Sequence, residues 1–275
     1  MTHFLNGKLV SEKELVISPR DVGYSRGYAV FDFLKTYPHH RLFRLQEHID
    51  RLFNSAKLIG LQMPWSKEQV AQWVKQVLEA NTSQDEKFIK IMVSGGISGT
   101  MLPAKEPTII ILVDPATQYP KNLYEDGVDV MTVKHTRYNS AAKSNNYIEG
   151  VKQMQLAQKM GAVEPIYYSD AQVFEGSNSN IFAVIDDKLL TPRDNILAGI
   201  TRGVLLEILD LDIPIEIRNF TLDELFGSSE AFLTGSGKEI VPITLIDSKK
   251  LGNGKVGAIT KEVIRQFQKY TLSNI

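Results

Sequence analysis

The chain contains no cysteine among its 275 residues. This absence excludes disulfides, thiolate metal ligands, iron–sulfur clusters and a cysteine nucleophile. Histidine is scarce as well, with five copies, and none of them stands in an HExxH or similar spacing, which argues against a dedicated transition-metal site. Neither a complete Walker A loop nor a GxSxG elbow is present. The chemistry must therefore come from other side chains.

An excess of charge of either sign is also missing. Lysine and arginine total 31 and aspartate and glutamate total 32, so the formal net charge is −1. Such a balance removes the usual electrostatic reason to expect nucleic acid or an anionic membrane as a partner. No run of about 18 apolar residues could span a bilayer, and the first residues do not resemble a signal peptide. We therefore expect a cytoplasmic protein.

The order of predicted elements indicates two lobes. Strands cluster and then helices follow in both halves, which favours mixed α/β lobes of the α+β type over a regular doubly wound sheet. The segment 114–127 is rich in prolines and turn residues and has little apolar periodicity, so we interpret it as a connection. The predicted organisation is an N-terminal lobe over 1–113 and a C-terminal lobe over 128–275.

Apolar spacing and capping residues set the expected elements. Ser66 with Gln69, and Thr221 with Glu224, match the capping box that opens a helix, and Asp186-Asp187 resembles a hairpin turn. Helices are expected over about 45–60, after Ser66, over 146–160, from Thr201 or Arg202, after Thr221 and over 256–270. Strands are expected over 88–94, 108–113, 129–133, 164–169, 180–185, 188–191 and 230–234.

Two segments contain candidate reactive groups. Lys143 lies among small and polar residues at a strand-to-helix junction, where partial desolvation can favour the neutral amine that Schiff-base chemistry needs. A surface lysine is the simpler alternative. Glu175 precedes a run of Gly, Ser and Asn and then an apolar strand, as expected for a carboxylate presented from a tight loop and braced by that run. An ordinary acidic turn fits the same residues.

Two further segments are suited to an anion. Gly199 frees a turn before Thr201, where helix-start N–H groups and a hydroxyl can bind a phosphate, although an N-cap without a ligand fits equally well. Ser236 lies in a second small-residue turn after a strand. Pyridoxal phosphate unites these features, because it needs a lysine for its aldehyde, an acid at its pyridinium nitrogen and donors for its phosphate.

Five motifs in this order make the chain similar to the class IV (fold type IV) pyridoxal-phosphate aminotransferases. That family includes D-amino-acid and branched-chain aminotransferases and 4-amino-4-deoxychorismate lyase. The resemblance covers nearly the whole chain and implies a two-lobed fold with the active site between the lobes of a homodimer. The motifs are Glu47-His48-Ile49-Asp50-Arg51-Leu52, Lys143-Ser144-x-Asn146, Glu175–Phe182, Gly199-Ile200-Thr201-Arg202 and Lys255-Val256-Gly257.

The resemblance implies a role for each matching residue. Lys143 would bind the cofactor covalently and shuttle the proton, Glu175 would keep the pyridine nitrogen protonated, and Arg51 would clamp the phosphate with its planar fork. Tyr147 would reach the cofactor's phenolic oxygen. The remaining phosphate ligands would be Ile200, Thr201, Ser236 and Gly237.

The residues that read the substrate depart from the family pattern. D-alanine-type relatives carry a tyrosine where this chain has Phe31, and an Arg-x-His set where the loop 94–103 has neither Arg nor His. The Tyr and Arg pair of branched-chain enzymes is missing as well. Arg26, Lys35 and Arg137 are the cations that could substitute, unless they are ordinary surface charges. We therefore expect D-alanine to be a poor substrate at best.

The predicted function is amino-group transfer between an amino acid, of D or branched-chain type, and a 2-oxo acid. One alternative is the lyase reaction, in which Lys143 drives elimination of pyruvate from aminodeoxychorismate. Another is a non-catalytic relative that acts as a binding module, which the intact set of Lys143, Glu175 and Arg51 argues against. The sequence predicts small-molecule substrates and no metal.

Overall fold

A computed structural model describes residues 1–273. The chain divides into two compact units, and each is described by itself. Unit 1 comprises Met1–Thr117 with Ala141–Asn146, and unit 2 comprises Gln118–Ser140 with Tyr147–Ile275. The sequence placed 141–146 in the second lobe. The structure assigns this segment to unit 1 because residues 143–145 form backbone hydrogen bonds with a strand of that unit.

Unit 1 is built on a six-stranded sheet in the order β2-β1-β6-β5-β3-β4. All of its neighbouring strands run antiparallel. The strands are β1 (Thr2–Leu5), β2 (Lys8–Ser11), β3 (Ala29–Tyr37), β4 (Arg41–Leu42), β5 (Lys87–Ser94) and β6 (Thr108–Pro115). The helices are α1 (Val22–Arg26), α2 (Leu45–Leu58) and α3 (Lys67–Glu79), with a 3₁₀ turn at Pro38–His40.

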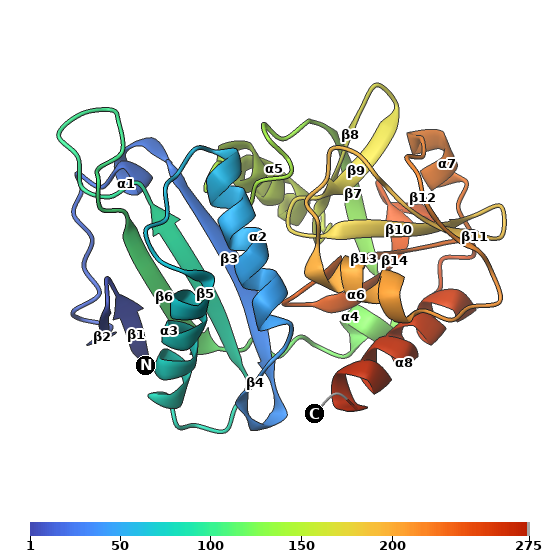
Figure 1. The fold of residues 1–275 in the computed structure, drawn as a ribbon. Helices are drawn as coiled ribbons and strands as arrows, with labels where there is room; N and C mark the ends of the chain where they lie inside the picture. Colours follow the sequence, from blue (N-terminus) through green and yellow to red (C-terminus); the bar gives the residue numbers. More distant parts are fainter. Residues whose placement is uncertain (274–275) are drawn as a thin grey trace. The chain divides into compact units, whose positions relative to one another are not determined.

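Helices α2 and α3 cover one face of this sheet (Figure 1). Strand side chains alternate between faces, so Ile89, Ile91 and Val93 of β5 enter the core under the helices while Lys90 and Met92 lie on the other face. On β3 the same alternation sends Phe31 and Phe33 to that other face. Unit 1 therefore has a helix-covered face and a second, half-buried face whose side chains include Phe31, Phe33 and Lys90.

Unit 2 contains a nine-stranded mixed sheet in the order β12-β11-β10-β13-β14-β7-β8-β9, with β15 paired to β14. The strand β9 also pairs with β10 through Glu175 and Asn180, which closes the strands from β10 to β9 into a ring and leaves β11 and β12 outside it. The strands are β7 (Val128–Lys134), β8 (Pro165–Ser169), β9 (Gln172–Gly176), β10 (Asn180–Ile185), β11 (Lys188–Thr191), β12 (Ile215–Ile217), β13 (Glu230–Gly235), β14 (Glu239–Ile246) and β15 (Lys249–Lys250).

Five helices accompany the sheet of unit 2. They are α4 (Asn122–Glu125), α5 (Ile148–Lys159), α6 (Ile200–Ile208), α7 (Leu222–Phe226) and α8 (Ala258–Ser273). Both α6 and α8 contact β13. Thr221 and Glu224 form the reciprocal capping box that opens α7. Asp186 and Asp187 both have positive φ angles, as the predicted hairpin turn requires.

The mixed α/β class predicted from the sequence is confirmed, and most predicted elements are present within two residues of their expected ends. Two differences matter for the site. Glu175 lies on the strand β9 rather than in a loop. The long strand β14 was not predicted from the sequence; it pairs with β13 and extends the sheet beyond it.

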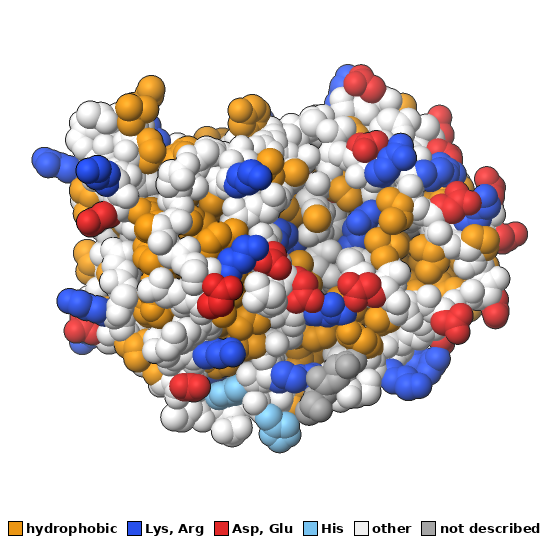
Figure 2. All heavy atoms as spheres, viewed as in Figure 1, with side chains coloured by type: hydrophobic (Ala, Val, Ile, Leu, Met, Phe, Trp, Pro, Cys, Tyr) orange, Lys and Arg blue, Asp and Glu red, His pale blue; other side chains and the backbone are white. Residues whose placement is uncertain are grey.

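Charged side chains of both signs are interspersed over the face shown in Figure 2, in keeping with the balanced composition. No helix in residues 1–273 is long and apolar enough to cross a bilayer. Within the same residues, no group of three His, Asp or Glu side chains is placed to hold a metal ion.

Candidate active site

The backbone of Lys143 is fixed between a strand and a helix of unit 1. Its carbonyl accepts a hydrogen bond from the Phe31 amide at 2.9 Å, and Asn145 N donates to the Ala29 carbonyl at 2.9 Å, so the segment pairs with β3. The Lys143 amide donates to Ser55 Oγ of α2 at 3.0 Å. The Lys143 ammonium lies 4.7 Å from the centroid of the Phe31 ring. The lysine thus projects from a rigid base beside an aromatic ring.

The same helix carries Arg51, one turn before Ser55. Ser55 Oγ donates to the Arg51 carbonyl at 2.8 Å, which links the lysine segment to the turn that presents the arginine. The Arg51 guanidinium is held by Asp32 of β3, with Nε 2.8 Å from Oδ2 and Nη2 2.9 Å from Oδ1. His48 Nδ1 lies 2.6 Å from the same Oδ1. Asp32 therefore fixes the plane of the guanidinium.

This network is buried, and both burial and its internal charges act on its protonation. Burial alone would raise the pKa of Asp32, but Arg51 and His48 outweigh it and hold that pKa well below its usual range. Burial lowers the pKa of His48, and the positive charges of Arg51 and Lys143 add to this effect against the opposing influence of Asp32. His48 is thus neutral at pH 7, and its Nδ1–H donates to Asp32.

In unit 2, Glu175 is 3% exposed and surrounded by donors. Its Oε1 accepts from Arg137 Nε at 2.8 Å and from Arg137 Nη2 at 2.5 Å. Its Oε2 accepts from Asn180 Nδ2 at 3.3 Å and from the Leu197 amide at 2.9 Å. Four donors are the environment of a carboxylate rather than of a carboxylic acid. The structure thus presents Glu175 as a fixed, buried anion.

The Ser and Asn residues after Glu175 are braced by a second acid, which differs from the sequence prediction. Glu164, 1% exposed, accepts from the Asn178 amide at 2.5 Å and from Ser179 Oγ at 3.0 Å. Of the predicted bracing residues, Asn180 is the one that contacts Glu175. Nothing in the sequence indicated that Glu164, eleven residues before Glu175, contacts the Ser and Asn run. The contact forms only when β8 pairs with β9 and brings Glu164 next to that run.

The N-terminus of α6 has the features of an anion site. Its N-cap, Gly199, offers no side-chain acceptor to the first N–H groups of the helix. A Cβ at Gly199 would lie 1.9 Å from Asn180 Oδ1, so the close approach requires glycine. Thr201 is buried in the first turn. Within residues 1–273, the buried Thr234 Oγ1 on the neighbouring β13 has no hydrogen-bond partner. This donor set fits a phosphate group.

The second predicted phosphate turn follows β13 directly. Ser236 and Gly237 lie between β13 and β14, and Tyr124 Oη donates to the carbonyl of the next residue, Lys238, at 3.2 Å. Burial is the main reason that the pKa of Tyr124 rises to about 12, and the negative charge of Glu239 adds to it. The neutral phenol of Tyr124 therefore holds this turn in place.

The other predicted site residues occupy varied positions. Tyr147 is the N-cap of α5 in unit 2. Arg26 is exposed, and its Nη1 donates to the carbonyl of the preceding residue at 3.0 Å. Lys35 forms an ion pair with Glu86 at 3.0 Å. Arg26, Lys35 and Arg137 were the candidate substrate cations, and that role stays a prediction for each.

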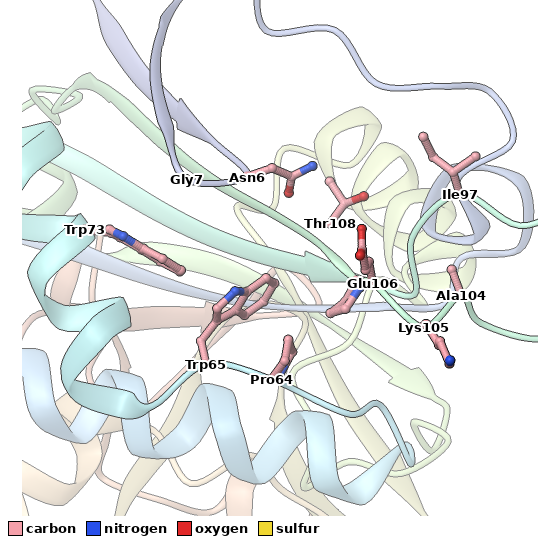
Figure 3. A pocket seen from close by; sticks show the side chains of 11 residues that line it. Asn6, Gly7, Pro64, Trp65, Trp73, Ile97, Ala104, Lys105, Glu106 and Thr108 are labelled. Carbon is pink, nitrogen blue, oxygen red and sulfur yellow. The ribbon is translucent and has the colours of Figure 1, made fainter.

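Unit 1 also contains a cavity of about 550 Å³ that is distinct from these residues. Figure 3 shows Trp65 and Trp73 on one side of it and the segment with Lys105, Glu106 and Thr108 on the other. None of the predicted site residues lines it. Its charged groups, one lysine and one glutamate, have opposite signs, so the cavity shows no preference for an anion. We assign the chemistry to the side chains above.

Sequence reasoning proposed the reactive residues but missed two residues that contact them. Unit 1 brings Phe31, Arg51 and Lys143 together, and unit 2 brings Glu175 together with the start of α6. Asp32 and the role of His48 were missed. The signal was available, because an aspartate inside the apolar run VFDFL must find a buried partner.

Comparisons with known proteins decide the family. Residues 29–246 match the profile of the family described as amino-transferase class IV. The chain belongs to this family. It is 35% identical to a Methanocaldococcus jannaschii protein provisionally named as a branched-chain-amino-acid aminotransferase, over 98% of this chain and 96% of the other. It is 32% identical to D-alanine aminotransferase of Staphylococcus aureus strain N315, over 98% of each chain.

Solved structures agree with this membership. A branched-chain aminotransferase from Thermoproteus uzoniensis superposes with a TM-score of 0.88 at 29% identity, over 99% of this chain and 95% of that chain. The predicted family and the fold type IV architecture are confirmed. Class IV aminotransferases use pyridoxal phosphate, and this chain is an aminotransferase enzyme.

Proposed function

We propose that the enzyme transfers an amino group between an amino acid and a 2-oxo acid with the help of pyridoxal phosphate. The observation that carries this proposal is Glu175, a buried carboxylate with four donors around it. An anion held in this way favours the protonated form of a facing ring nitrogen. When bound, the cofactor supplies an electron sink for the substrate's α-carbon.

The side chains have separate tasks. Lys143 holds the cofactor covalently, and its released amine moves the proton that leaves the substrate's α-carbon. Arg51, its guanidinium plane fixed by Asp32, binds the phosphate. In unit 2, the first turn of α6, with Thr201, and the turn at Ser236–Gly237 are suited to donate hydrogen bonds to a phosphate.

Two observations support a substrate class: the names of the relatives, and the residues at the positions where the family binds substrate. The names of the two curated relatives point to branched-chain amino acids and to D-alanine. Phe31 cannot donate a hydrogen bond, and the loop 94–103 provides no cation. We therefore propose a donor of D-amino-acid or branched-chain type, with D-alanine a poor substrate at best.

We also propose a cytoplasmic homodimer. Unit 1 exposes several large apolar side chains: Val16 (71%), Tyr24 (79%), Ile97 (60%), Met101 (75%) and Leu102 (69%). Contact with a second copy would remove this surface from water. A chain without cysteine needs no oxidising compartment for folding.

The direct test uses purified protein loaded with pyridoxal phosphate. We expect a visible absorbance band, and borohydride reduction followed by peptide mapping should find the adduct on Lys143. A panel of D- and L-amino acids with 2-oxo acid acceptors should then show amino transfer. Pyruvate released from aminodeoxychorismate without an acceptor would instead establish the lyase. A colourless protein, or an adduct on another lysine, would contradict the proposal.

A further inference from the structure

The cavity of unit 1 takes no part in the proposed function. Its volume of about 550 Å³ lies within the range of small-molecule sites, which is about 300–1,000 Å³. Both of the chain's two tryptophans, Trp65 and Trp73, line it (Figure 3). Their rings meet edge to face, with centroids 5.7 Å apart and an angle of 74° between the planes. The cavity therefore offers aromatic surface of the kind that binds apolar groups and organic cations.

The wall across from the tryptophans contains two opposite charges. Lys105 and Glu106 are neighbours in the chain, and both line the cavity (Figure 3). Both side chains are exposed, and within residues 1–273 neither makes a hydrogen bond or an ion pair with another residue. An anionic ligand would meet the negative charge of this wall and a cationic ligand its positive charge. A molecule with one charge of each sign matches the wall best.

A third polar group, the side chain of Asn6, is fixed by the turn between β1 and β2. The Asn6 amide donates to the Ile109 carbonyl at 3.0 Å, and Asn6 Oδ1 accepts from the Ile109 amide at 2.9 Å. The side-chain oxygen is thereby engaged, whereas Asn6 Nδ2 donates to no other residue in the described part of the chain. Because an amide NH₂ group can donate two hydrogen bonds, Asn6 is able to bind a carboxylate together with Lys105.

The backbone of the charged wall is held in place from behind. Thr108 Oγ1 donates at 2.7 Å to Asp21, which is buried. Gly96 has a φ angle of +78°, and a Cβ atom there would lie 2.0 Å from the Glu106 carbonyl oxygen, so this close approach requires glycine. The segment 104–108 therefore presents its side chains from a fixed backbone, and a ligand that binds to it has little backbone to order.

We propose that this cavity binds a free amino acid with an apolar or aromatic side chain. Glu106 binds the ammonium group of the amino acid, and Lys105 and Asn6 bind its carboxylate. The side chain of the amino acid lies against Trp65 and Trp73. None of the residues assigned to the cofactor lines the cavity, so this amino-acid site is separate from the reacting centre and goes beyond the proposed function.

Three probes that share a phenyl group and differ in charge test the proposal. At pH 7 racemic N,N-dimethylphenylalanine carries both charges, N,N-dimethyl-2-phenylethylamine carries the positive charge alone, and 3-phenylpropanoate carries the negative charge alone. None of them has a primary amine, so none forms a Schiff base with pyridoxal phosphate. Because both tryptophans of the chain line the cavity, the tryptophan fluorescence of the holoenzyme reports binding there. We expect the zwitterion to bind saturably and more tightly than either probe with a single charge.

Two substitutions in the exposed wall separate the two charges. Glu106→Gln should weaken binding of the zwitterion and of the cationic probe about 3- to 10-fold, without weakening binding of the anionic probe. Lys105→Met should weaken binding of the zwitterion and of the anionic probe by a similar factor, without weakening binding of the cationic probe. Lys75→Met and Glu79→Gln remove the same charges from exposed positions of α3 outside the cavity, and both should match the wild type.

The proposal is overturned if the zwitterion binds no more tightly than the single-charge probes, or if Glu106→Gln and Lys105→Met leave its affinity unchanged. A wild type without a saturable change of fluorescence up to about 10 mM zwitterion would overturn it as well. The titration does not depend on amino transfer. The absorbance band of the cofactor and the transfer assay test the proposed function separately, so a failure of one is distinguishable from a failure of the other.

Discussion

Replacing Asp32 with asparagine tests the network that holds the proposed phosphate clamp. Asp32 is fully buried and accepts four hydrogen bonds: two from Arg51 at 2.8 and 2.9 Å, one from His48 at 2.6 Å and one from the Phe33 amide at 2.8 Å. Asparagine keeps the shape but removes the charge and turns part of the acceptor into a donor. The Arg51 guanidinium would then be buried without its counter-charge.

The expected cost follows from that burial. Removing one partner of a buried ion pair destabilises proteins by about 3–5 kcal/mol, because the other charge is left uncompensated. An exposed pair contributes about 0–1 kcal/mol. Asp50, on the same helix as Arg51, provides the matched control, because it pairs with Lys67 at 2.7 Å while 47% of its side chain is exposed. We therefore expect Asp32→Asn to cost several times more than Asp50→Asn.

Urea denaturation of both variants without cofactor measures this difference at pH 7. Titration with pyridoxal phosphate then measures its affinity, which should fall in Asp32→Asn because Arg51 loses its fixed orientation, and should stay near wild type in Asp50→Asn. Equal destabilisation by the two substitutions would refute the argument from burial. Normal cofactor affinity in Asp32→Asn would refute the positioning of Arg51.

Four further predictions concern single side chains. Glu175→Gln should keep the cofactor but slow turnover by about 10²–10⁴-fold, since an amide cannot hold the ring nitrogen protonated; near-normal turnover would contradict its role. Arg51→Lys keeps the charge but loses the planar fork, so cofactor affinity measured by absorbance titration should fall, and unchanged affinity would count against the clamp. The pKa of His48 is lowered in the folded protein, so its contribution to stability is present above about pH 6.5 and is lost as the pH falls; the free energy of unfolding of His48→Gln should decline less steeply than that of wild type between pH 7 and 5. The pKa of Tyr124 is raised to about 12, so its contribution to stability is present below about pH 10 and is lost as the pH rises towards 12. The difference between the spectrophotometric titrations of wild type and Tyr124→Phe should therefore show no tyrosine that ionises near pH 10.

The sequence predicted elements well where their signal is local. The capping residues Thr221 and Glu224 form their box, and the apolar spacing of α2 places Ile49 and Leu52 in the core. Strand pairing is different, because it joins residues that are far apart in the chain. The pairing of residues 143–145 with β3 moved this segment into unit 1, and no local pattern encodes that contact.

The candidate site shows the same division. Lys143 and Glu175 were proposed from short motifs, and Arg51 was proposed from the family resemblance. Asp32 and Glu164 were missed because they act on other residues, through contacts that only the folded chain creates. Their burial is nevertheless a signal in the sequence, since an acid within an apolar strand has to meet a donor.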